Sequence, residues 1–269
     1  MIKLTDLLKE IQTKPKAIIM AGGASVGKST VLNTLKPVLK DFVDLNADKY
    51  VEDKNSPMFG NLSAASSQIR KQDLPNAIAN KQNLVYDTTA SNLSTLQPVL
   101  DMLDEAGYDT AMVMVYAHPI VSFLRNFKRE RKVPAVGVLG TWGNVYSLVD
   151  DYKRIFGDKF ILVSTPASTP EEKAEMVKFD NAAKSGKLKE YFEELLSTGE
   201  FVSTFRKDDT GLSPEELEKR EKQREKTKQQ LSTNIDKVAD TFIKVQSDLN
   251  PVDIKELPNK VKAFIGWTQ

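Results

Sequence analysis

A glycine-rich run near the beginning of this 269-residue chain limits the folds that the chain can adopt more than any other feature of the sequence. The run fits the pattern G-x-x-x-x-G-K-S and is followed directly by Thr30. It consists of Gly22, Gly23, Ala24, Ser25, Val26, Gly27, Lys28 and Ser29. The apolar residues 17–21 before it predict a strand buried on both faces, and residues 29–39 after it predict an amphipathic helix. A strand, a glycine turn and a helix in this order indicate a phosphate-binding loop.

The residue types of this loop suit a triphosphate. Glycines let the backbone fold tightly around a phosphate so that successive N–H groups point inward, and the following helix adds the positive end of its dipole. Lys28 is expected to reach the β- and γ-phosphates, and the Ser29 hydroxyl is expected to bind Mg²⁺. ATP and Mg²⁺ are therefore the predicted cofactors, and residues 22–30 are the predicted ATP-binding loop.

Composition excludes several other classes of protein. Hydrophobic residues make up 40% of the chain and charged residues 28%, which is typical of a globular protein. The net charge of +1 gives no general attraction for nucleic acid, so any anion-binding surface must be local. The chain has no cysteine for disulfides or thiolate zinc sites, and no apolar run approaches the roughly 18 residues of a membrane span. We expect a cytoplasmic protein without a membrane segment.

From residue 16 to about 165, short apolar runs alternate with helical stretches. The expected strands are 17–21, 42–46, 83–87, 110–117 and 159–164. The expected helices between them are 29–39, 63–80, 93–106, 121–131 and 145–156. Such alternation implies βαβ units, so residues 1–168 are predicted to form an α/β P-loop core: a three-layer sandwich with a five-stranded, mostly parallel sheet. Residues 1–14 are expected to add a short amphipathic helix to this core.

The last hundred residues have a different character. Helices are expected at 170–182, 186–197, 214–248 and 252–264, so residues 169–269 are predicted to be a helical C-terminal extension, with a linker near 203–213. Apolar residues with spacing 4-3-4-3-4 form a seam on the long helix, which is typical of a surface that packs against another helix or against the core. The seam consists of Leu231, Ile235, Val238, Phe242, Val245 and Leu249. We expect it to support self-association or the binding of a protein partner.

Other features of the chain narrow the kind of P-loop protein. The Asn/Thr-Lys-x-Asp motif by which a GTPase reads its base is absent from the ends of the fourth and fifth strands. The third strand ends in Asp87 and Thr88, without the Glu that a motor-type ATPase places after its Asp. A kinase needs a carboxylate near the acceptor hydroxyl, a substrate pocket opposite the loop, and arginines over the transferred phosphoryl group. All three have candidates.

The carboxylates follow the second and third strands. Ligands of an open parallel sheet lie outside the carboxyl ends of its strands, so Asp48 is expected to face the γ-phosphate and to deprotonate an acceptor hydroxyl. Asp87 is expected to bind Mg²⁺ through water or to hold the substrate. The predicted substrate residues are Asp48, Arg70, Asp87 and Thr88. The alternatives are a helix cap or turn for the two aspartates and a surface position for Arg70.

A basic segment after the fourth strand supplies the arginines. In the expected helix 121–131, Arg125 and Arg129 are four residues apart and therefore lie on one face, with Arg131 close behind. Arginines in a lid over ATP would neutralise charge developing on the transferred group. The predicted catalytic residues are thus Lys28, Asp48, Arg125 and Arg129, and Arg131 is assigned to ATP binding. The alternative is a solvated basic helix.

Two aromatic residues near this segment have less specific interpretations. His118 is expected to be a turn or packing residue, since the kinase scheme already has a base. Trp142 falls in an expected glycine-rich loop at 137–143, where a hydrophobic plug is favoured over a residue that stacks on a base.

Residues 16–165 resemble the zeta-toxin and polynucleotide-kinase branch of the P-loop kinases. The matching runs are AGGASVGKST, the LNAD that ends strand two, the VYDTT that ends strand three, and LDEAGYDTAMVMVYAHPIVSFLRNFKRERKVP. The resemblance implies that Asp48 is the base, Lys28 and Ser29 act on ATP and its metal, and Arg125 or Arg129 belongs to the lid. Zeta toxins more often carry Glu-Gly-Thr where this chain has Asp87-Thr88-Thr89.

The function predicted from the sequence is therefore an ATP-dependent kinase. Its expected acceptor is a hydroxyl of a nucleotide, a nucleotide sugar or a similar small molecule, since zeta toxins phosphorylate nucleotide sugars. One alternative is a kinase of polynucleotide ends or of modified bases in DNA or RNA, which would need a basic groove leading to Asp48. A second alternative is a nucleotide-driven switch or assembly protein that uses the helical extension as its interaction surface.

Overall fold

The computed structural model describes residues 14–197 and 213–266 of the chain. The predicted N-terminal helix at 1–14 and almost all of the predicted linker at 203–213 lie outside these ranges. None of the described helices has the length and apolar character that crossing a bilayer requires.

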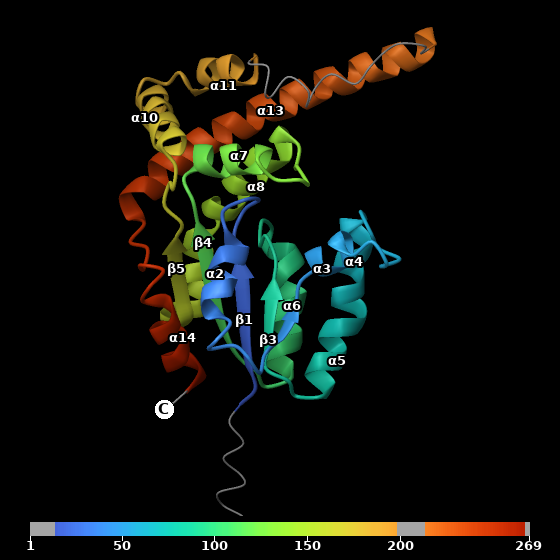
Figure 1. Cartoon of the computed structure of the whole chain (residues 1–269), viewed down its shortest axis with the longest axis vertical. Helices are drawn as coiled ribbons and strands as arrows, with labels where there is room; N and C mark the ends of the chain where they lie inside the picture. The colour runs from blue at the N-terminus through green and yellow to red at the C-terminus, as the bar shows by residue number, and fades with distance from the viewer. Residues whose placement is uncertain (1–13, 198–212, 267–269) are drawn as a thin grey trace, which may run out of the picture.

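The centre of the molecule is a five-stranded sheet in which every strand is parallel to its neighbours (Figure 1). The strands are β1 (Lys16–Ala21), β2 (Val43–Leu45), β3 (Leu84–Asp87), β4 (Asp109–Tyr116) and β5 (Phe160–Ser164), in the spatial order β2-β3-β1-β4-β5. All five predicted strands are confirmed to within one or two residues. The strand order leaves β1 between β3 and β4, so the loop after β1 lies at the middle of the sheet's carboxyl edge.

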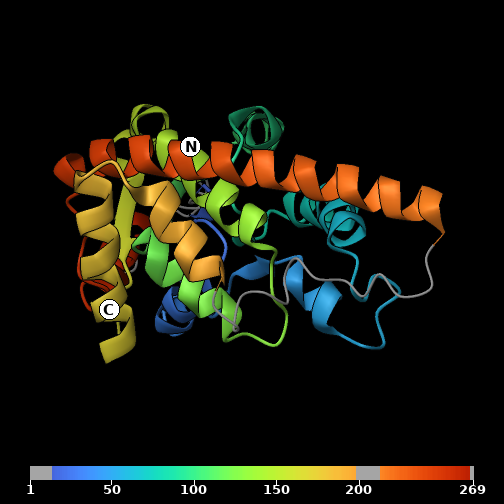
Figure 2. The same cartoon turned by 90° about the horizontal axis from the view of Figure 1, so that it is seen from above.

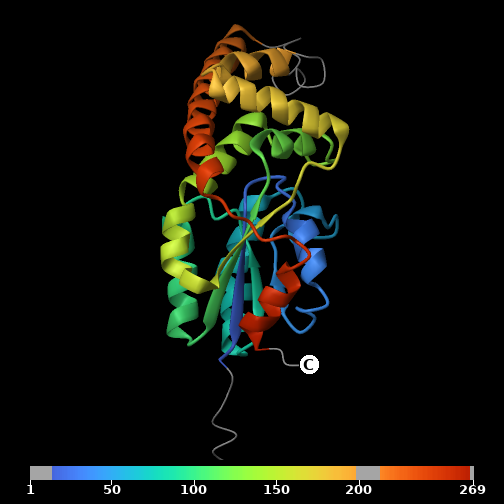
Figure 3. The same ribbon diagram turned by 90° about the vertical axis from the view of Figure 1, so that its left-hand side faces the viewer.

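Helices cover both faces of the sheet, which confirms the predicted three-layer sandwich (Figure 3). On one face lie α2 (Lys28–Leu35) and α14 (Leu257–Ile265), and on the other lie α6 (Leu93–Glu105) and α9 (Val149–Phe156). Burial between these layers is complete for the central strands, where residues 17–21 are 0% exposed. The continuous apolar run before the glycine loop is therefore explained by a strand without a solvent face.

The connection from β2 to β3 forms a separate group of short helices. It contains α3 (Asp48–Glu52), α4 (Leu62–Gln68), a π-helical turn (Ile69–Asp73) and α5 (Leu74–Ala79). The predicted helix at 63–80 is thus largely confirmed, although it contains Pro75. The π-helical turn absorbs the proline, because Leu74 N–H bonds to the carbonyl of Ile69 just before the ring interrupts the usual pattern.

The helix predicted at 121–131 is shorter than expected. The observed helix, α7 (Pro119–Phe127), ends four residues earlier, so Arg129 and Arg131 are not on it. The Asn126 side chain causes this end by closing the following loop: its Nδ2 donates to the Val133 carbonyl at 2.7 Å, and its Oδ1 accepts from the Val133 N–H at 2.9 Å. The prediction that Arg125 and Arg129 share a helical face is therefore wrong.

The glycines at 137–143 do not form the loop that was expected. They belong to α8 (Ala135–Ser147), and a Cβ on Gly140 would lie 2.8 Å from the Asn234 side chain. Gly140 thus permits a close approach between two helices rather than a turn. Trp142 is fully buried and donates from Nε1 to the Ala117 carbonyl at 2.9 Å, which confirms its interpretation as a plug.

The C-terminal helices form a layer above the carboxyl edge of the sheet. They are α10 (Pro170–Lys184), α11 (Leu188–Ser197) and the long α13 (Pro214–Asp248), which crosses the top of the molecule (Figure 2). Ser213 and Glu216 cap α13 reciprocally. The seam residues from Leu231 to Val245 are at most 8% exposed, because α13 packs along α8 and α11. The expectation that this seam is a surface for self-association is therefore wrong: the chain covers it itself.

His118 lies where these layers meet. It caps the start of α7, its Nε2 is 3.0 Å from Asp180 of α10, and its ring packs edge-on against Phe179 and Phe242. The interpretation of His118 as a packing residue is confirmed.

Candidate active site

The glycine-rich run forms a tight loop between β1 and α2. Gly22 has a φ of +149° and a Cβ there would lie 2.8 Å from the Val115 carbonyl oxygen, so only glycine fits. Gly27 has a φ of +95° and is the cap residue of α2, without any side chain that bonds to the first N–H groups of the helix. These N–H groups at a positive helix end are the donors that a phosphate requires.

Lys28 and Asp87 lie together under this loop. The Lys28 Nζ donates to the Gly22 carbonyl at 3.0 Å and is 3.9 Å from Asp87 Oδ1. Burial raises the pKa of Asp87 to about 6, opposed by Lys28 and reinforced by the negative charges of Asp48 and Asp44. A buried carboxyl that is costly to ionise is a favourable neighbour for an added cation.

Asp48 is the first residue of α3, directly after β2. Its backbone N–H donates to Asn46 Oδ1 at 2.9 Å, which fixes the turn between strand and helix. Its carboxylate accepts a hydrogen bond from Arg131 Nη2 at 2.6 Å, and the two side chains are 39% and 37% exposed. Asp48 is therefore accessible to a substrate once Arg131 moves.

The three predicted lid arginines have different surroundings. Arg129 Nη1 is 3.4 Å from the Ser25 hydroxyl of the glycine-rich loop, and Arg131 contacts Asp48. Arg125 points elsewhere: its guanidinium contacts Thr165, the Pro166 carbonyl and Glu172. Two of the three arginines thus reach the site from the loop after α7.

A cavity of about 370 Å³ joins these parts. Nine of the site residues predicted from the sequence line this cavity. They are Ala24, Ser25, Lys28, Asp48, Arg70, Asp87, Thr88, Arg129 and Arg131. Ser29 and Thr30, at the start of α2, are exposed and do not line it. Arg125 does not line it either.

Several lining residues were not singled out in the sequence. Among them are Asn46, Leu62, Ile69, Tyr86 and Thr95. Asn46 had a signal, since it stands in the LNAD run and its amide orients Asp48. Tyr86 lies in β3, within the VYDTT run. Leu62, Ile69 and Thr95 belong to helices that fold over the site from the β2–β3 connection and from α6, and nothing in their local sequence indicates that position.

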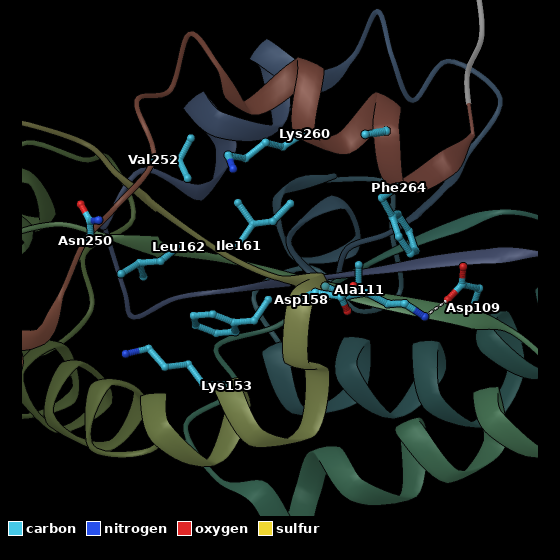
Figure 4. A pocket seen from close by; sticks show the side chains of 13 residues that line it. Asp109, Ala111, Lys153, Asp158, Ile161, Leu162, Asn250, Val252, Lys260 and Phe264 are labelled. Atoms are coloured by element: carbon cyan, nitrogen blue, oxygen red, sulfur yellow. Dashed lines mark hydrogen bonds and ion pairs between the residues drawn. The ribbon is translucent and has the colours of Figure 1, made fainter.

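A second cavity, of about 560 Å³, lies between β5 and α14. Figure 4 shows Lys260 and Phe264 of α14 pointing toward the strand residues that form its floor. One of its two lining aspartates, Asp109, is neutralised by ion pairs with Lys16 and Lys159. This cavity is larger, but it lies away from the glycine-rich loop and contains none of the predicted site residues.

The zeta toxin family model matches residues 3–137, just over half of the sequence. The chain belongs to the zeta toxin family. Membership of this family, together with the P-loop fold, supports a kinase-type phosphotransferase that uses a nucleotide. No curated protein matches the sequence.

Solved structures with a similar fold have low sequence identity to this family member. A chain of the PezAT toxin–antitoxin system of Streptococcus pneumoniae is 13% identical, with a TM-score of 0.45 over 57% of this chain and 68% of that one. A chain of the Pnkp1/Rnl/Hen1 RNA repair complex is 20% identical, with a TM-score of 0.44 over 55% of this chain and 48% of that one. Shikimate kinase from Acinetobacter baumannii is 18% identical, with a TM-score of 0.37 over 67% and 98%.

Proposed function

We propose that the protein transfers the γ-phosphoryl group of ATP to a hydroxyl of a nucleotide, a nucleotide sugar or a similar small molecule, with Asp48 as the general base. The observation that carries the proposal is the convergence of four chain segments on one cavity. The glycine-rich loop, the end of β2, the end of β3 and the arginine loop after α7 all line it. A phosphoryl-transfer site needs a phosphate cradle, a base and mobile cations within one such space.

The donor side is formed by the glycine-rich loop and Lys28. Its N–H groups and the start of α2 would hold the β-phosphate, and the Lys28 ammonium would move from the Gly22 carbonyl to the phosphate oxygens. Arg129, which already contacts Ser25 of the loop, is suited to neutralise charge on the transferred group. Both cations already lie at the loop, so only short movements would bring them onto the phosphate oxygens.

The acceptor side is formed by Asp48 with Arg70, Thr88 and the short helices of the β2–β3 connection. The Asp48 carboxylate would take the proton of the acceptor hydroxyl as its oxygen bonds to the γ-phosphorus and the bond to the β-phosphate oxygen breaks, releasing ADP. Arg131, now on Asp48, would turn to the γ-phosphate and free the base. Within the described parts of the chain, Arg70 bonds only to the Ser66 carbonyl of its own helical turn, so its remaining donors suit an anionic group of the acceptor.

The site also has oxygen ligands of the kind that Mg²⁺ prefers. The Asp87 carboxylate inside the cavity and the Ser29 hydroxyl, exposed on the first turn of α2 beside Lys28, would hold the ion. When bound, Mg²⁺ neutralises charge on the phosphates. Burial of Asp87 beside two other aspartates fits this assignment, because a cation relieves the cost of its ionisation.

The experiment is a transfer assay with γ-labelled ATP and three separate acceptor pools: nucleosides and nucleotides, nucleotide sugars, and DNA or RNA. We expect label in a small-molecule product, and about 10²–10⁴-fold slower labelling with Asp48→Asn. Label that appears only as free phosphate in every pool would reject the kinase and favour a nucleotide-driven switch. Label in the polymer alone, with binding that weakens steeply as salt rises, would identify a polynucleotide kinase instead.

A further inference from the structure

The contacts of Arg125 indicate a different role from the lid arginine that the sequence predicted. We infer that Arg125 and Glu172 are positioning residues that hold the phosphate loop in shape through Thr165, so that the C-terminal extension sets the geometry of the nucleotide site. The inference deepens the proposed function and rests on it. It concerns the one predicted lid arginine that does not reach the cavity.

The first link joins Thr165 to the phosphate loop. Thr165 follows β5 directly and is held there by its N–H, which donates to the Tyr116 carbonyl at 2.8 Å. Its hydroxyl donates to the Val26 carbonyl at 2.6 Å. Its methyl group packs against the loop as well, because a Cβ on Gly27 would lie 3.1 Å from it. Thr165 is only 8% exposed, so water does not replace these contacts.

The second link joins Thr165 to Arg125. Arg125 Nη1 donates to the Thr165 hydroxyl oxygen at 2.9 Å, which leaves the single hydroxyl hydrogen for Val26. Arg125 Nη2 donates to the Pro166 carbonyl at 2.7 Å. The guanidinium thus fixes both the direction of the threonine hydroxyl and the backbone that follows it.

The third link joins Arg125 to the C-terminal helices. Glu172, in the first turn of α10, accepts from Arg125 Nε at 3.1 Å and from Nη2 at 3.4 Å. It also accepts from the backbone N–H of Ser168 at 2.7 Å, and its side chain is 4% exposed. Burial alone raises the pKa of Glu172, but the hydrogen bonds from Ser168 and Arg125 outweigh it and hold the pKa below its usual value. The carboxylate is therefore charged, and both of its oxygens accept hydrogen bonds.

These links act on the part of the loop that would bind phosphate. In a trans peptide the C=O and the N–H point in opposite directions, and the Val26 carbonyl shares its peptide plane with the Gly27 N–H. Holding the Val26 carbonyl on Thr165 therefore turns the Gly27 N–H to the other side, away from Thr165, where the loop's donors can converge on a phosphate. We call the contacts of Thr165, Arg125 and Glu172 the clamp. Without the clamp this peptide can rotate, and the phosphate-binding loop then loses the Gly27 N–H as a donor.

The same contacts distinguish a clamp from a lid. Each of the three guanidinium nitrogens of Arg125 already donates to a partner, two of them to the buried Glu172. A lid arginine that leaves for the γ-phosphate would abandon that buried carboxylate, which is strongly unfavourable. Arg129 contacts the Ser25 hydroxyl and Arg131 contacts the half-exposed Asp48, and neither contacts a buried acid among the described residues, so these are the arginines suited to that role.

Two adjacent glutamates provide a matched test in the full chain. Glu172→Gln weakens the clamp, whereas Glu171→Gln removes only an ion pair with Lys128, in which the Glu171 side chain is 51% exposed. We expect Glu172→Gln to weaken the binding of both Mg²⁺-ATP and Mg²⁺-ADP by about 10- to 100-fold, the range typical of residues that orient a ligand-binding group from behind. Glu171→Gln should stay within about twofold of wild type, since exposed pairs contribute little. The KM for the acceptor should not change in either variant.

Thr165→Val makes the test independent of the charge at Glu172. Valine keeps the shape of threonine, but it neither accepts a hydrogen bond from Arg125 nor donates one to Val26. Thr165→Val should therefore weaken the binding of Mg²⁺-ATP and Mg²⁺-ADP to a similar extent. The double variant should lose no more nucleotide affinity than either single variant, because the two substitutions act through one chain of contacts. If Glu172→Gln fails to fold, Thr165→Val decides.

Two results would overturn the inference. One is wild-type affinity for both nucleotides in Glu172→Gln and Thr165→Val. The other is a fall in kcat with unchanged nucleotide affinity, since that is the behaviour of an arginine that acts on the transferred group. A wild-type protein that does not bind Mg²⁺-ATP at all would instead reject the proposed function, so the two failures are separable.

Discussion

The contact between Arg131 and Asp48 permits a prediction with two magnitudes of very different size. Its atoms are 2.6 Å apart, but the side chains are 37% and 39% exposed, so solvent screens the pair and it should contribute only about 0.2–1 kcal/mol. Arg131→Gln should therefore lower the melting temperature by no more than about 2–4 °C. If Arg131 moves to the γ-phosphate, however, its loss should lower the rate of transfer by about 10²–10³-fold, as for other charge-stabilising donors.

The assay combines thermal unfolding with transfer of label from γ-labelled ATP. Arg154→Gln is the matched control, since Arg154 forms a similar exposed pair with Asp151 at 3.1 Å on α9, away from the cavity. The control should reproduce the small effect on stability and leave transfer unchanged. Transfer within threefold of wild type in Arg131→Gln would refute the assignment of Arg131. A fall in melting temperature well beyond a few degrees would refute the claim that the pair is weak.

Three further perturbations follow from the site and its supports. Asp48→Asn should lower transfer by about 10²–10⁴-fold while the Kd for ATP stays within about threefold, and normal transfer would exclude Asp48 as the base. Phe242→Ala should cost about 3–5 kcal/mol in denaturant unfolding. That cost should not depend on protein concentration, since the seam is buried within one chain. Burial beside Phe179 and Phe242 lowers the pKa of His118 below 6.5, although Asp180 opposes this, so the unfolded chain takes up the proton first. Stability should therefore fall as pH drops below about 7, and His118→Asn, which keeps a capping side chain, should reduce that fall between pH 7.5 and 5.5.

Local signals predicted the core of the fold well. A buried run followed by G-x-x-x-x-G-K-S is sufficient to identify β1 and the phosphate loop, because the Lys and Ser at this spacing distinguish the loop from other glycine-rich turns between a strand and a helix. The remaining strands were found from apolar runs bounded by helices, and the parallel arrangement follows from their alternation. The strand order was not predicted, since pairing between β1 and β4 joins segments about ninety residues apart and leaves no local pattern.

The positions of the arginines depend on contacts between distant segments of the chain, which local sequence patterns do not reveal. The helix that carries Arg125 was extended too far, because its end is decided by the side chain of Asn126 reaching the backbone of Val133 across a loop. The partner of Arg125, Glu172, lies 47 residues further along the chain. In the sequence, Glu172 looks only like an ordinary acidic residue in the first turn of a capped helix. Tertiary contacts of this kind are not written in the spacing of the residues.

The seam on α13 illustrates the same limit in another way. Its heptad spacing correctly predicted a buried stripe, and the notion of a partner helix was also correct. The partner is α8 of the same chain, which the sequence did not indicate because the glycines at 137–143 read as a loop. Two of those glycines are explained by the close approach of α13, Gly140 against Asn234 and Gly143 against Lys237.

The most direct test of the whole account is the affinity of the folded protein for Mg²⁺-ATP with and without Lys28. Isothermal titration of wild type and of Lys28→Met, whose side chain has a similar length but no charge, measures it. We expect saturable binding by the wild type and its loss in the variant, with both proteins equally folded. Absence of binding by the wild type, or equal binding by the variant, would contradict it.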